Sequence, residues 1–550
     1  MMAAAARRPP AGPGLPAAAK LLAGLLALLL LAVLPDASAR AQAQEAVVVS
    51  LINHFESAHI YGELRVHGVD ITDHELLARF YEQRRFEPVW VFRGREGRQA
   101  RRLRDAIAVG ERHGLDPRRY HLAEADAAAA EGDWGAVELL LSEAFVRQGR
   151  HRARGVVDPA SVDPEWRMAR SEPDGLALLE AVARGANAQR LLDRLWPESR
   201  EYWQLLAARL QLLDHIDEPP PAPIGGGALL RPGMEDPRVP LLRERLLGSA
   251  DPDRFYDLQL TDAVIAFQRS QGLEPDGAVG PRTLAALNRT VAQQVRQIDA
   301  NLERWRWLPE AFPDTYVRVN IADFRLLAVS KGHVDLDMPV IVGLPYRQTP
   351  VFTETMKYLV FNPYWEVPRR LAVQDQLPKL RADAHRMAEL GFEAAPIAGG
   401  PMEPVDRIDW QTVTASQFPY HLRQQPGPAN PLGRVKFMLP NEYAVYLHDT
   451  PTRGLFDRVE RTFSSGCIRV GDALALAEWV LGGQRESWDA TRIVDAMDTG
   501  ATRTVVLEEP IPVFVVYFTA QPAASGTIAL QFDVYGRDAR IIAALYDEPQ

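Results

Sequence analysis

A lone cysteine and a histidine that precedes it are the side chains best suited to chemistry. Cys467 is the only cysteine in the 550-residue chain, and it follows His448 by nineteen positions. A free thiol has a pKa of about 8.5 and is mostly protonated at neutral pH, so a nucleophilic cysteine needs a neighbouring base or positive charge. His448 can be that base if a strand that carries it lies beside the turn that carries Cys467. The alternative is that Cys467 is a small buried side chain with no chemical role.

The N-terminal segment is typical of a secretory signal. Arg7, Arg8 and Lys20 precede an apolar run over residues 21–34, and small residues follow over 37–43. This order predicts a signal peptide over residues 1–43. The run is shorter than the ~20 residues of a usual membrane span; an uncleaved anchor is the alternative, and it would be the chain's one link to a membrane. We therefore expect the mature protein in the periplasm, where a single thiol allows no internal disulfide.

Composition narrows the class of protein. Hydrophobic residues make up 47% of the chain, and the formal net charge is -10. The acidic balance argues against nucleic acid as a partner, because nucleic-acid binding leaves a basic footprint. The sequence has neither a histidine pair with a glutamate between nor paired cysteines, so no metal or other cofactor is expected. A length of 550 residues predicts three or four domains.

Helical periodicity dominates the part of the chain that follows the signal. Residues 44–218 are predicted to form a helical scaffold domain, with helices at Thr72–Arg84, Arg101–His113, Gly135–Gln148 and Ala188–Leu213. A proline-rich run over 219–223 and three glycines over 225–227 predict a linker over residues 219–227. A domain boundary is expected there.

Residues 228–288 predict a compact three-helix module. Apolar and turn residues follow one another in the order Leu260-x-x-Ala263-Val264-x-x-Phe267-Gln268, Asp276-Gly277-x-Val279-Gly280 and Thr283-Leu284-x-x-Leu287-Asn288. This pattern resembles the peptidoglycan-binding module of cell-wall enzymes, and the alternative is a plain helical spacer. A connecting helix is predicted within residues 289–314, because apolar residues recur at steps of four and three from Val291 to Trp305.

The hydrophobic period changes to that of strands near Thr315. Residues 315–550 predict a mainly β domain with a core over 315–498 and an insertion over 366–433. The insertion has helical character over Leu371–Leu390, and an insertion of this size between strands often covers a site as a lid. The predicted strands are Tyr316–Ile321, Arg325–Ser330, Met338–Val342, Lys357–Phe361, Arg434–Leu439, Tyr443–His448, Val505–Leu507, Val513–Phe518 and Ile528–Phe532. The fold class expected for the chain is multidomain α+β.

Several motifs of the β domain occur together in one family. Four of them are Gly343-Leu344-Pro345-Tyr346-Arg347-Gln348-Thr349-Pro350, Asn362-Pro363-Tyr364-Trp365, Tyr446-Leu447-His448-Asp449-Thr450 and Ser464-Ser465-Gly466-Cys467-Ile468-Arg469. With them the chain resembles the YkuD-type L,D-transpeptidases, and within these the large periplasmic subgroup that has a helical scaffold and a peptidoglycan-binding module. The commoner family motif has a second histidine where this chain has Ser465, so the general-base role falls to His448.

The resemblance implies a catalytic domain that transfers acyl groups between peptidoglycan stem peptides. Cys467 would attack the carbonyl of the third stem residue, a diaminopimelate centre, and expel the terminal D-alanine, while His448 would move the proton. Backbone N–H groups around Ser465, Gly466 and Cys467 would stabilise the oxyanion. The imidazole would be oriented by the backbone carbonyl of Asp449, with the side chain of Asp449 as the other option.

The same resemblance suggests roles in substrate binding for other side chains. Arg469 would anchor a stem carboxylate, or it would brace the loop through a salt bridge. Trp365, Tyr364 and Tyr446 are expected to line the substrate groove, and core packing is the alternative for Trp365 and Tyr364. The expected partners are peptidoglycan stem peptides, with other cell-wall enzymes as further candidates.

The sequence leaves more than one function open. Cross-linking between diaminopimelate residues is the function we expect. If water resolved the thioester the protein would be an L,D-carboxypeptidase, and if a protein lysine did so it would anchor lipoproteins. A non-catalytic peptidoglycan-binding structural protein is the alternative from another class, and the intact His448, Gly466, Cys467 and Arg469 argue against it.

Overall fold

The computed structural model describes residues 42–59, 62–168, 172–309, 311–484, 486–523 and 527–546. The signal segment predicted over residues 1–43 lies outside these ranges except for its last two residues. The described residues form two compact units, one of residues 42–152 and 172–196, the other of residues 153–168 and 197–546. Within the described ranges, no helix combines the length and the apolar character needed to cross a membrane. The helical and β regions together confirm the expected multidomain α+β class.

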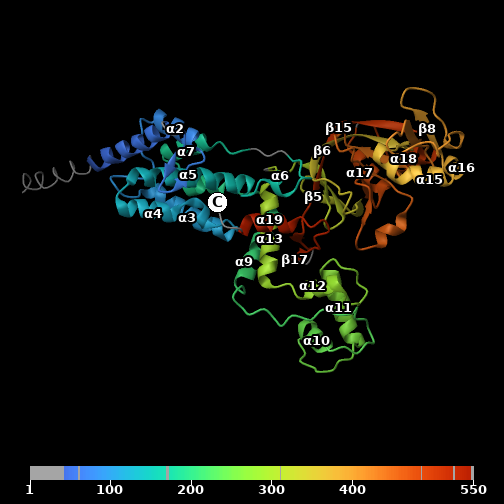
Figure 1. Ribbon diagram of the computed structural model, residues 1–550, viewed down its shortest axis with the longest axis horizontal. Helices are drawn as coiled ribbons and strands as arrows, with labels where there is room; N and C mark the ends of the chain where they lie inside the picture. The colour runs from blue at the N-terminus through green and yellow to red at the C-terminus, as the bar shows by residue number, and fades with distance from the viewer. Residues whose placement is uncertain are drawn as a thin grey trace, which may run out of the picture. The chain divides into compact units, whose positions relative to one another are not determined.

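The first unit is a helical bundle built around one buried helix. Residues 42–59 are helical, and the other elements are β1 (Arg65–Val66), β2 (Val69–Asp70), α2 (His74–Gln83), α3 (Arg98–Arg112), η1 (Pro117–Tyr120), α4 (Leu122–Glu131), α5 (Trp134–Arg154), α7 (Gly175–Ala183) and α8 (Ala188–Asp193). Every residue of α5 from Gly135 to Val146 is buried, which is typical of a helix enclosed on all sides. Figure 1 shows α5 among α2, α3, α4 and α7.

A buried carboxylate on α5 organises the chain that crosses it. Glu138 is fully buried, and it accepts hydrogen bonds from the Tyr81 hydroxyl (2.8 Å) and from the backbone N–H groups of Val89 (2.5 Å), Trp90 (2.9 Å) and Val91 (2.8 Å). Burial raises the pKa of Glu138 to about 7, and these donors oppose that rise. The side chain thus supplies acceptors to backbone N–H groups that would otherwise be buried without a partner.

Replacing Glu138 by glutamine is expected to destabilise the first unit by about 2–3 kcal/mol. The amide NH₂ of glutamine cannot accept a hydrogen bond, so it would face backbone N–H donors that lose their partner. Scanning calorimetry of the whole chain would measure the change, with Glu82→Gln on the exposed side of α2 as the matched control. An unfolding transition equal to that of the control would contradict the assigned role.

The second unit contains a nine-stranded sheet. Its strands are β3 (Thr315–Asn320), β4 (Arg325–Ser330), β5 (His333–Gly343), β6 (Phe352–Phe361), β11 (Val435–Met438), β12 (Leu447–His448), β13 (Thr462–Ser464), β14 (Ile468–Val470) and β15 (Arg503–Val516). Their order is β13-β5-β14-β12-β11-β6-β15-β3-β4, and β4 also pairs with β5, so the sheet curls back on itself. The remaining elements near the sheet are η4 (Arg453–Asp457), α17 (Ala473–Gly482), α18 (Ala490–Asp498), β16 (Ala520–Pro522) and β17 (Ile528–Leu530).

Some predicted boundaries were wrong. The strand expected over Tyr443–His448 is paired only at Leu447–His448, because the side chain of Asn441 bonds both the N–H and the carbonyl of Val445 and so forms a turn. The helix expected over Ala188–Leu213 is two helices, α8 and α9 (Arg200–Leu213). Pro197 lies between them, and Ser199 caps the second. The two strands expected over 505–518 are one strand, β15, with a register shift between Val506 and Ile511.

The connecting helix α13 (Val291–Arg306) begins with a capping box formed by Thr290 and Gln293. The sequence predicted one buried stripe, but every residue from Gln297 to Arg306 is buried. The reason is that α9 and α19 (Asp538–Tyr546) both pack against α13. Its buried charges are paired. Arg304 donates to Asp538 at 2.5 Å, Arg306 donates to Glu303 at 2.9 Å, and Asp299 accepts from Arg209 at 2.5 Å.

The three-helix module predicted over 228–288 contains α10 (Val239–Leu247), α11 (Leu258–Ser270) and α12 (Pro281–Leu287), which lie together in Figure 1. Its core includes Leu242, Tyr256, Leu260, Val264 and Leu287. The module therefore has an apolar core of its own.

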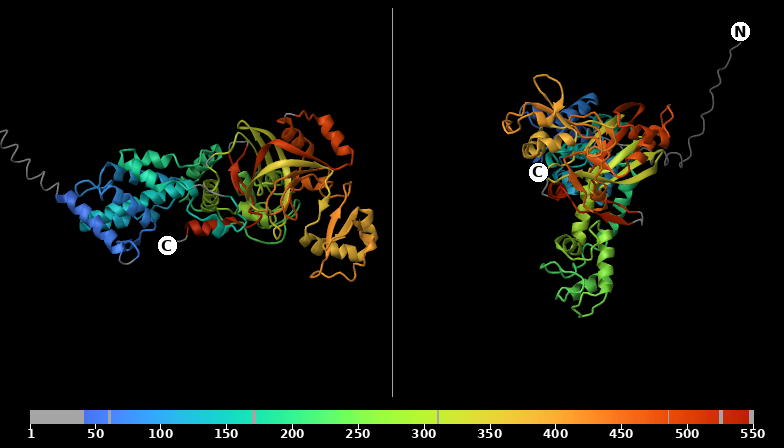
Figure 2. Two further views of the ribbon diagram at one scale, coloured as in Figure 1. Left: turned by 90° about the horizontal axis from the view of Figure 1, so that it is seen from above. Right: turned by 90° about the vertical axis from the view of Figure 1, so that its right-hand side faces the viewer.

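The insertion over 366–433 is a small lobe beside the large sheet (Figure 2). It consists of α14 (Arg369–Leu371), a π-helical turn η2 (Ala372–Gln376), α15 (Leu377–Ala382), α16 (Ala384–Glu389), η3 (Val405–Arg407) and a sheet of β7 (Trp365–Glu366), β10 (Tyr420–Gln424), β8 (Phe392–Pro396) and β9 (Glu403–Pro404). A separate apolar cluster that includes Leu380, Trp410 and Leu422 holds it together. We call this lobe the lid insertion. A short helix α6 (Pro159–Val162) completes the second unit.

Candidate active site

The sheet brings Cys467 and His448 to one face. Strands β12 and β14 are parallel neighbours, with His448 level with Arg469. Cys467 lies in the bend directly before β14, two residues from Arg469. On the other side of β12, Lys436 of β11 is level with His448. Cys467, His448 and Arg469 line one cavity of about 470 Å³.

His448 is buried and held in one orientation. Its Nδ1 lies 2.5 Å from the backbone carbonyl oxygen of Asp449, which accepts the hydrogen bond. The Asp449 carboxylate points elsewhere, because it accepts from the backbone N–H of Arg434 (2.8 Å) and from the guanidinium of Arg453 (2.5 Å). With the proton on Nδ1, Nε2 is the nitrogen that can accept a proton.

The imidazole of His448 is neutral in this environment. Burial, and after it the positive charge of Arg469, lowers the pKa of His448 to about 3, and Lys436 adds to the effect. Two cations on the same face thus disfavour a third positive charge. A neutral imidazole at neutral pH is the form that a general base requires.

The thiol of Cys467 is half-buried and protonated at rest. Burial raises its pKa, while the N–H and hydroxyl of Tyr446 and the charges of Lys436 and Arg469 act in the opposite direction. The Sγ–H donates to the carbonyl of Ala444 at 3.6 Å. Transfer of the proton to His448 would therefore require the S–H bond to turn away from Ala444.

The turn that carries Cys467 is fixed by hydrogen bonds within it. The Ser464 hydroxyl donates to the carbonyl of Cys467 (2.5 Å) and accepts from the N–H of Gly466 (3.1 Å). Gly466 has φ of +123°, which only glycine adopts readily. The Ser465 hydroxyl accepts from Arg347 at 3.0 Å.

Of the three aromatic residues predicted to line the groove, two line the cavity and one does not. Trp365 and Tyr446 line the cavity, and Trp365 also packs edge-on against Phe392 of the lid insertion at 6.1 Å between ring centroids. Tyr364 is not among the lining residues; its ring lies under the guanidinium of Arg423 at 4.5 Å.

Among the described residues, Arg469 has no carboxylate partner. Its Nε is buried and has no hydrogen-bond partner within the same ranges. The salt bridge that was considered for it is therefore not formed within these ranges. Lys436 does not line the cavity, but it is level with His448 on the neighbouring strand, and its ammonium lies 3.8 Å from the centroid of the Tyr446 ring. The pKa of Lys436 lies below its usual value because burial lowers it more than the proximity of Cys467 raises it.

Sequence reasoning missed Lys436 and Arg347. Lys436 alternates with the buried Val435 and Phe437, but only the pairing of β11 with β12 shows that it faces the site. Arg347 belongs to a motif already noted in the sequence. It reaches Ser465 and, at 2.6 Å, Asp375 of the lid insertion, so it connects the lid to the turn that carries Cys467. No group of three or more His, Cys, Asp or Glu side chains in the described part of the chain is placed to hold a metal ion.

Comparisons with known families agree with this organisation. Residues 314–506 match the model of the L,D-transpeptidase catalytic domain (YkuD), residues 238–287 match the "Putative peptidoglycan binding domain", and residues 75–208 match the scaffold domain. A protein of Haemophilus influenzae named "Putative L,D-transpeptidase" is 35% identical over 246 residues, which are 45% of this chain and 49% of that protein. The chain thus spans about half the length of the curated relative that it matches.

Solved structures similar to the chain include three L,D-transpeptidases. The enzyme from Mycobacterium smegmatis is 14% identical (TM-score 0.19, covering 37% of this chain and 58% of that one). L,D-transpeptidase 3 from Mycobacterium tuberculosis is 13% identical (0.18; 38% and 65%), and the Xylanimonas cellulosilytica enzyme is 17% identical (0.16; 54% and 100%). TM-scores this low support no inference about this chain.

The family matches confirm the resemblance that was drawn from the motifs. They cover the helical, three-helix and β regions in the expected order along the chain. The chain therefore carries a YkuD-type L,D-transpeptidase catalytic domain, together with a peptidoglycan-binding domain and a scaffold domain.

Proposed function

We propose that the protein cross-links peptidoglycan by joining diaminopimelate residues of neighbouring stem peptides through a thioester on Cys467. The observation that carries the proposal is the single thiol in a cavity shared with a neutral, oriented imidazole and a cation that has no carboxylate partner in the described ranges. A charged ion pair of thiolate and imidazolium is not favoured here, because burial raises the thiol pKa and lowers that of the imidazole.

The first half-reaction forms the thioester. Nε2 of His448 accepts the Sγ proton as sulfur attacks the carbonyl carbon of the third stem residue. The bond between that carbonyl carbon and the nitrogen of D-alanine then breaks, and His448 returns the proton to the leaving amine. The carbonyl of Asp449 keeps the imidazole in the required tautomer throughout.

The second half-reaction releases the enzyme. A side-chain amine of a second stem attacks the thioester carbonyl, the C–S bond breaks, and the proton of the amine returns to sulfur through His448. The product is a new amide between two stems. Water in place of the amine would give a shortened stem and no cross-link.

Arg469 lines the cavity, Lys436 lies on the same face of the sheet, and their positive charges suit an anionic substrate. Stem peptides carry carboxylates, and a half-buried guanidinium with no carboxylate partner in the described ranges can bind one in a bidentate manner. We assign this role to Arg469. Trp365, on the lid side of the cavity, and Tyr446 supply apolar surface for the stem.

The binding module supports peptidoglycan as the partner. A domain that holds the glycan or stem near the cavity raises the local substrate concentration. Substrate of this kind lies outside the cytoplasmic membrane, which supports an extracytoplasmic location, and we propose the periplasm.

Mass spectrometry of products tests the proposal. The purified protein would be incubated with disaccharide-tetrapeptide, and the expected product is a dimer that has lost one D-alanine. A disaccharide-tripeptide alone would show that water is the acceptor and would contradict cross-linking. Unchanged substrate would contradict both activities and favour a non-catalytic binding protein.

A further inference from the structure

A buried threonine connects the end of β5 to the turn that carries Cys467. Thr349 is fully buried, and its hydroxyl accepts from the N–H of Gly343 (2.9 Å) and donates to the carbonyl of Gly466 (2.9 Å). Both hydrogen-bonding capacities of this hydroxyl are thus used at defined positions. Thr349 has no part in the proton transfers described above.

The carbonyl that Thr349 holds belongs to the peptide bond between Gly466 and Cys467. A trans peptide is planar, so its C=O and N–H groups point in opposite directions. Fixing the Gly466 carbonyl therefore fixes the direction of the Cys467 N–H. The constraint matters at this position because Gly466, at φ of +123°, lacks a side chain that would restrict rotation of its peptides.

The Cys467 N–H is also a donor that the turn leaves available. The N–H of Gly466 is committed to the Ser464 hydroxyl. No backbone or side-chain acceptor for the Cys467 N–H occurs within the part of the chain that the structure describes. An N–H next to the nucleophile, without an acceptor, is suited to a developing oxyanion.

We propose that Thr349 is a positioning residue that aims the Cys467 N–H at the carbonyl oxygen of the acyl donor, and that Tyr535 near the C-terminus holds Thr349 in place. This inference rests on the proposed function, because it assumes that Cys467 attacks a carbonyl.

The C-terminal segment forms hydrogen bonds with both backbone groups of Thr349, the N–H and the carbonyl. The Tyr535 hydroxyl donates to the carbonyl of Gly343 (2.6 Å) and accepts from the N–H of Thr349 (3.3 Å). Arg537 donates to the carbonyl of Thr349 (3.3 Å) and to the side chain of Gln348 (2.8 Å). The loop over 343–349 is therefore closed by residues almost two hundred positions later in the chain.

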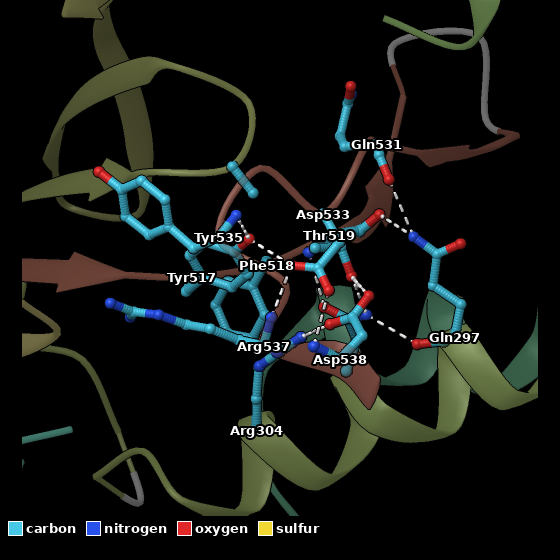
Figure 3. Close-up of polar contacts among 12 residues, drawn as sticks. Gln297, Arg304, Tyr517, Phe518, Thr519, Gln531, Asp533, Tyr535, Arg537 and Asp538 are labelled. Atoms are coloured by element: carbon cyan, nitrogen blue, oxygen red, sulfur yellow. Dashed lines mark hydrogen bonds and ion pairs between the residues drawn. The ribbon is translucent and has the colours of Figure 1, made fainter. Parts of the chain in front are cut away.

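The segment is itself firmly anchored. The Tyr535 ring stacks on Tyr517 (5.7 Å between centroids, 19°), and the guanidinium of Arg537 lies 5.0 Å from both ring centroids. Figure 3 shows the polar contacts of Asp533 and Asp538 with neighbouring residues. Asp533 accepts from the Tyr517 hydroxyl, and Asp538 accepts from Thr519 (2.7 Å) and from Arg304 of α13 (2.5 Å). These buried and part-buried charge-assisted bonds resist movement of the segment.

Two reactions of the Cys467 thiol can show whether Thr349 orients the Cys467 N–H or only supports the turn as a whole. A carbapenem acylates Cys467 when sulfur adds to the lactam carbonyl, the ring C–N bond breaks and the ring nitrogen takes the proton, so an oxyanion forms on the way. Iodoacetamide alkylates the thiol by displacement of iodide, and no oxyanion forms. Only the first reaction depends on the direction of the Cys467 N–H.

Thr349→Val is expected to slow carbapenem acylation by about 10- to 100-fold, somewhat less than the loss of a whole oxyanion donor. Alkylation by iodoacetamide is expected to stay within about twofold of wild type, since the thiol and its neighbours are unchanged. Thr349→Ser keeps the hydroxyl and is expected to restore most of the acylation rate. Tyr535→Phe keeps the ring stack but loses the hydroxyl, and it is expected to slow acylation in the same direction. Intact-mass time courses measure both reactions.

Other outcomes would overturn the inference. Acylation of Thr349→Val at the wild-type rate would show that the hydroxyl does not matter. Equal losses in acylation and alkylation would show that Thr349 only supports the turn. Wild-type acylation by Tyr535→Phe would remove Tyr535 from the proposal. A wild-type protein that is alkylated but neither acylated nor active on tetrapeptide would instead overturn the proposed function, and this role with it.

Discussion

Cys467→Ala is expected to abolish both the release of D-alanine from tetrapeptide stems and the covalent capture of a carbapenem. Cys467 is the only thiol of the chain, so no other side chain can form a thioester. The expected loss of turnover is roughly 10⁴-fold or more, as for the removal of a nucleophile from an enzyme that uses covalent catalysis. Intact-mass spectrometry should show one carbapenem adduct on the wild-type protein and none on the variant.

The variant should remain folded, because the thiol is half-buried and lines a cavity. Cys467 is half-buried, and its one direct hydrogen bond as a donor, to Ala444, is long. An unchanged thermal unfolding curve would show that the loss is chemical. Residual D-alanine release by Cys467→Ala, or an adduct on it, would contradict a cysteine mechanism. Ser464→Ala is a useful comparison, because it removes a hydroxyl of the same turn and keeps the thiol.

Local signals in the sequence predicted most of the elements of the fold. Period changes located the helical region, the three-helix module and the strands, because each of these has a regular apolar pattern. Errors arose where a side chain ends an element early. The Asn441 turn shortens β12, and Pro197 divides α8 from α9. The full burial of α13 was not predictable, because it depends on α9 and α19, which are far away in the sequence.

The candidate site shows the same division between local and long-range information. Residue type and spacing point to Cys467 and His448, and the sequence offers both the carbonyl and the side chain of Asp449 as a partner for the imidazole. The structure favours the carbonyl, because the carboxylate is engaged by Arg453 and by the N–H of Arg434. The positions of Lys436 and Thr349 could not be predicted, since each depends on a contact between strands or segments with no shared motif.

The placement of Tyr364 illustrates why adjacent residues need not share a role. Successive side chains of an extended segment point to opposite faces. Trp365 faces the cavity, so Tyr364 turns away from it and packs under Arg423. A sequence motif that contains both aromatics cannot distinguish between them without the orientation of the strand.

Replacing His448 by glutamine should change the pH dependence of acylation as well as its rate. In the wild type the imidazole has a pKa of about 3 and the thiol pKa is raised. The neutral pair therefore persists across the neutral range, and we expect the carbapenem acylation rate to vary little between about pH 5 and pH 8. In His448→Gln no side chain accepts the proton. The Cys467 thiol must therefore lose its proton to solvent before it can react. We expect a loss of about 10²- to 10⁴-fold at pH 7, and a rate that rises about tenfold for each pH unit.

The low pKa of the His448 imidazole should also make the folding stability of the wild type depend on pH. The pKa of His448 is about 3 in the folded protein and about 6.5 in an unfolded chain. Between these values the unfolded state binds more protons, so the contribution of His448 is fully present above pH 6.5 and is lost as the pH falls toward 3. Urea unfolding at pH 7 and pH 5 should therefore show a larger loss of stability for the wild type than for His448→Gln. An acid limb of the wild-type acylation rate near pH 6.5, or equal losses of stability, would mean that the imidazole is not held neutral, and the general-base role would then need a charged pair in its place.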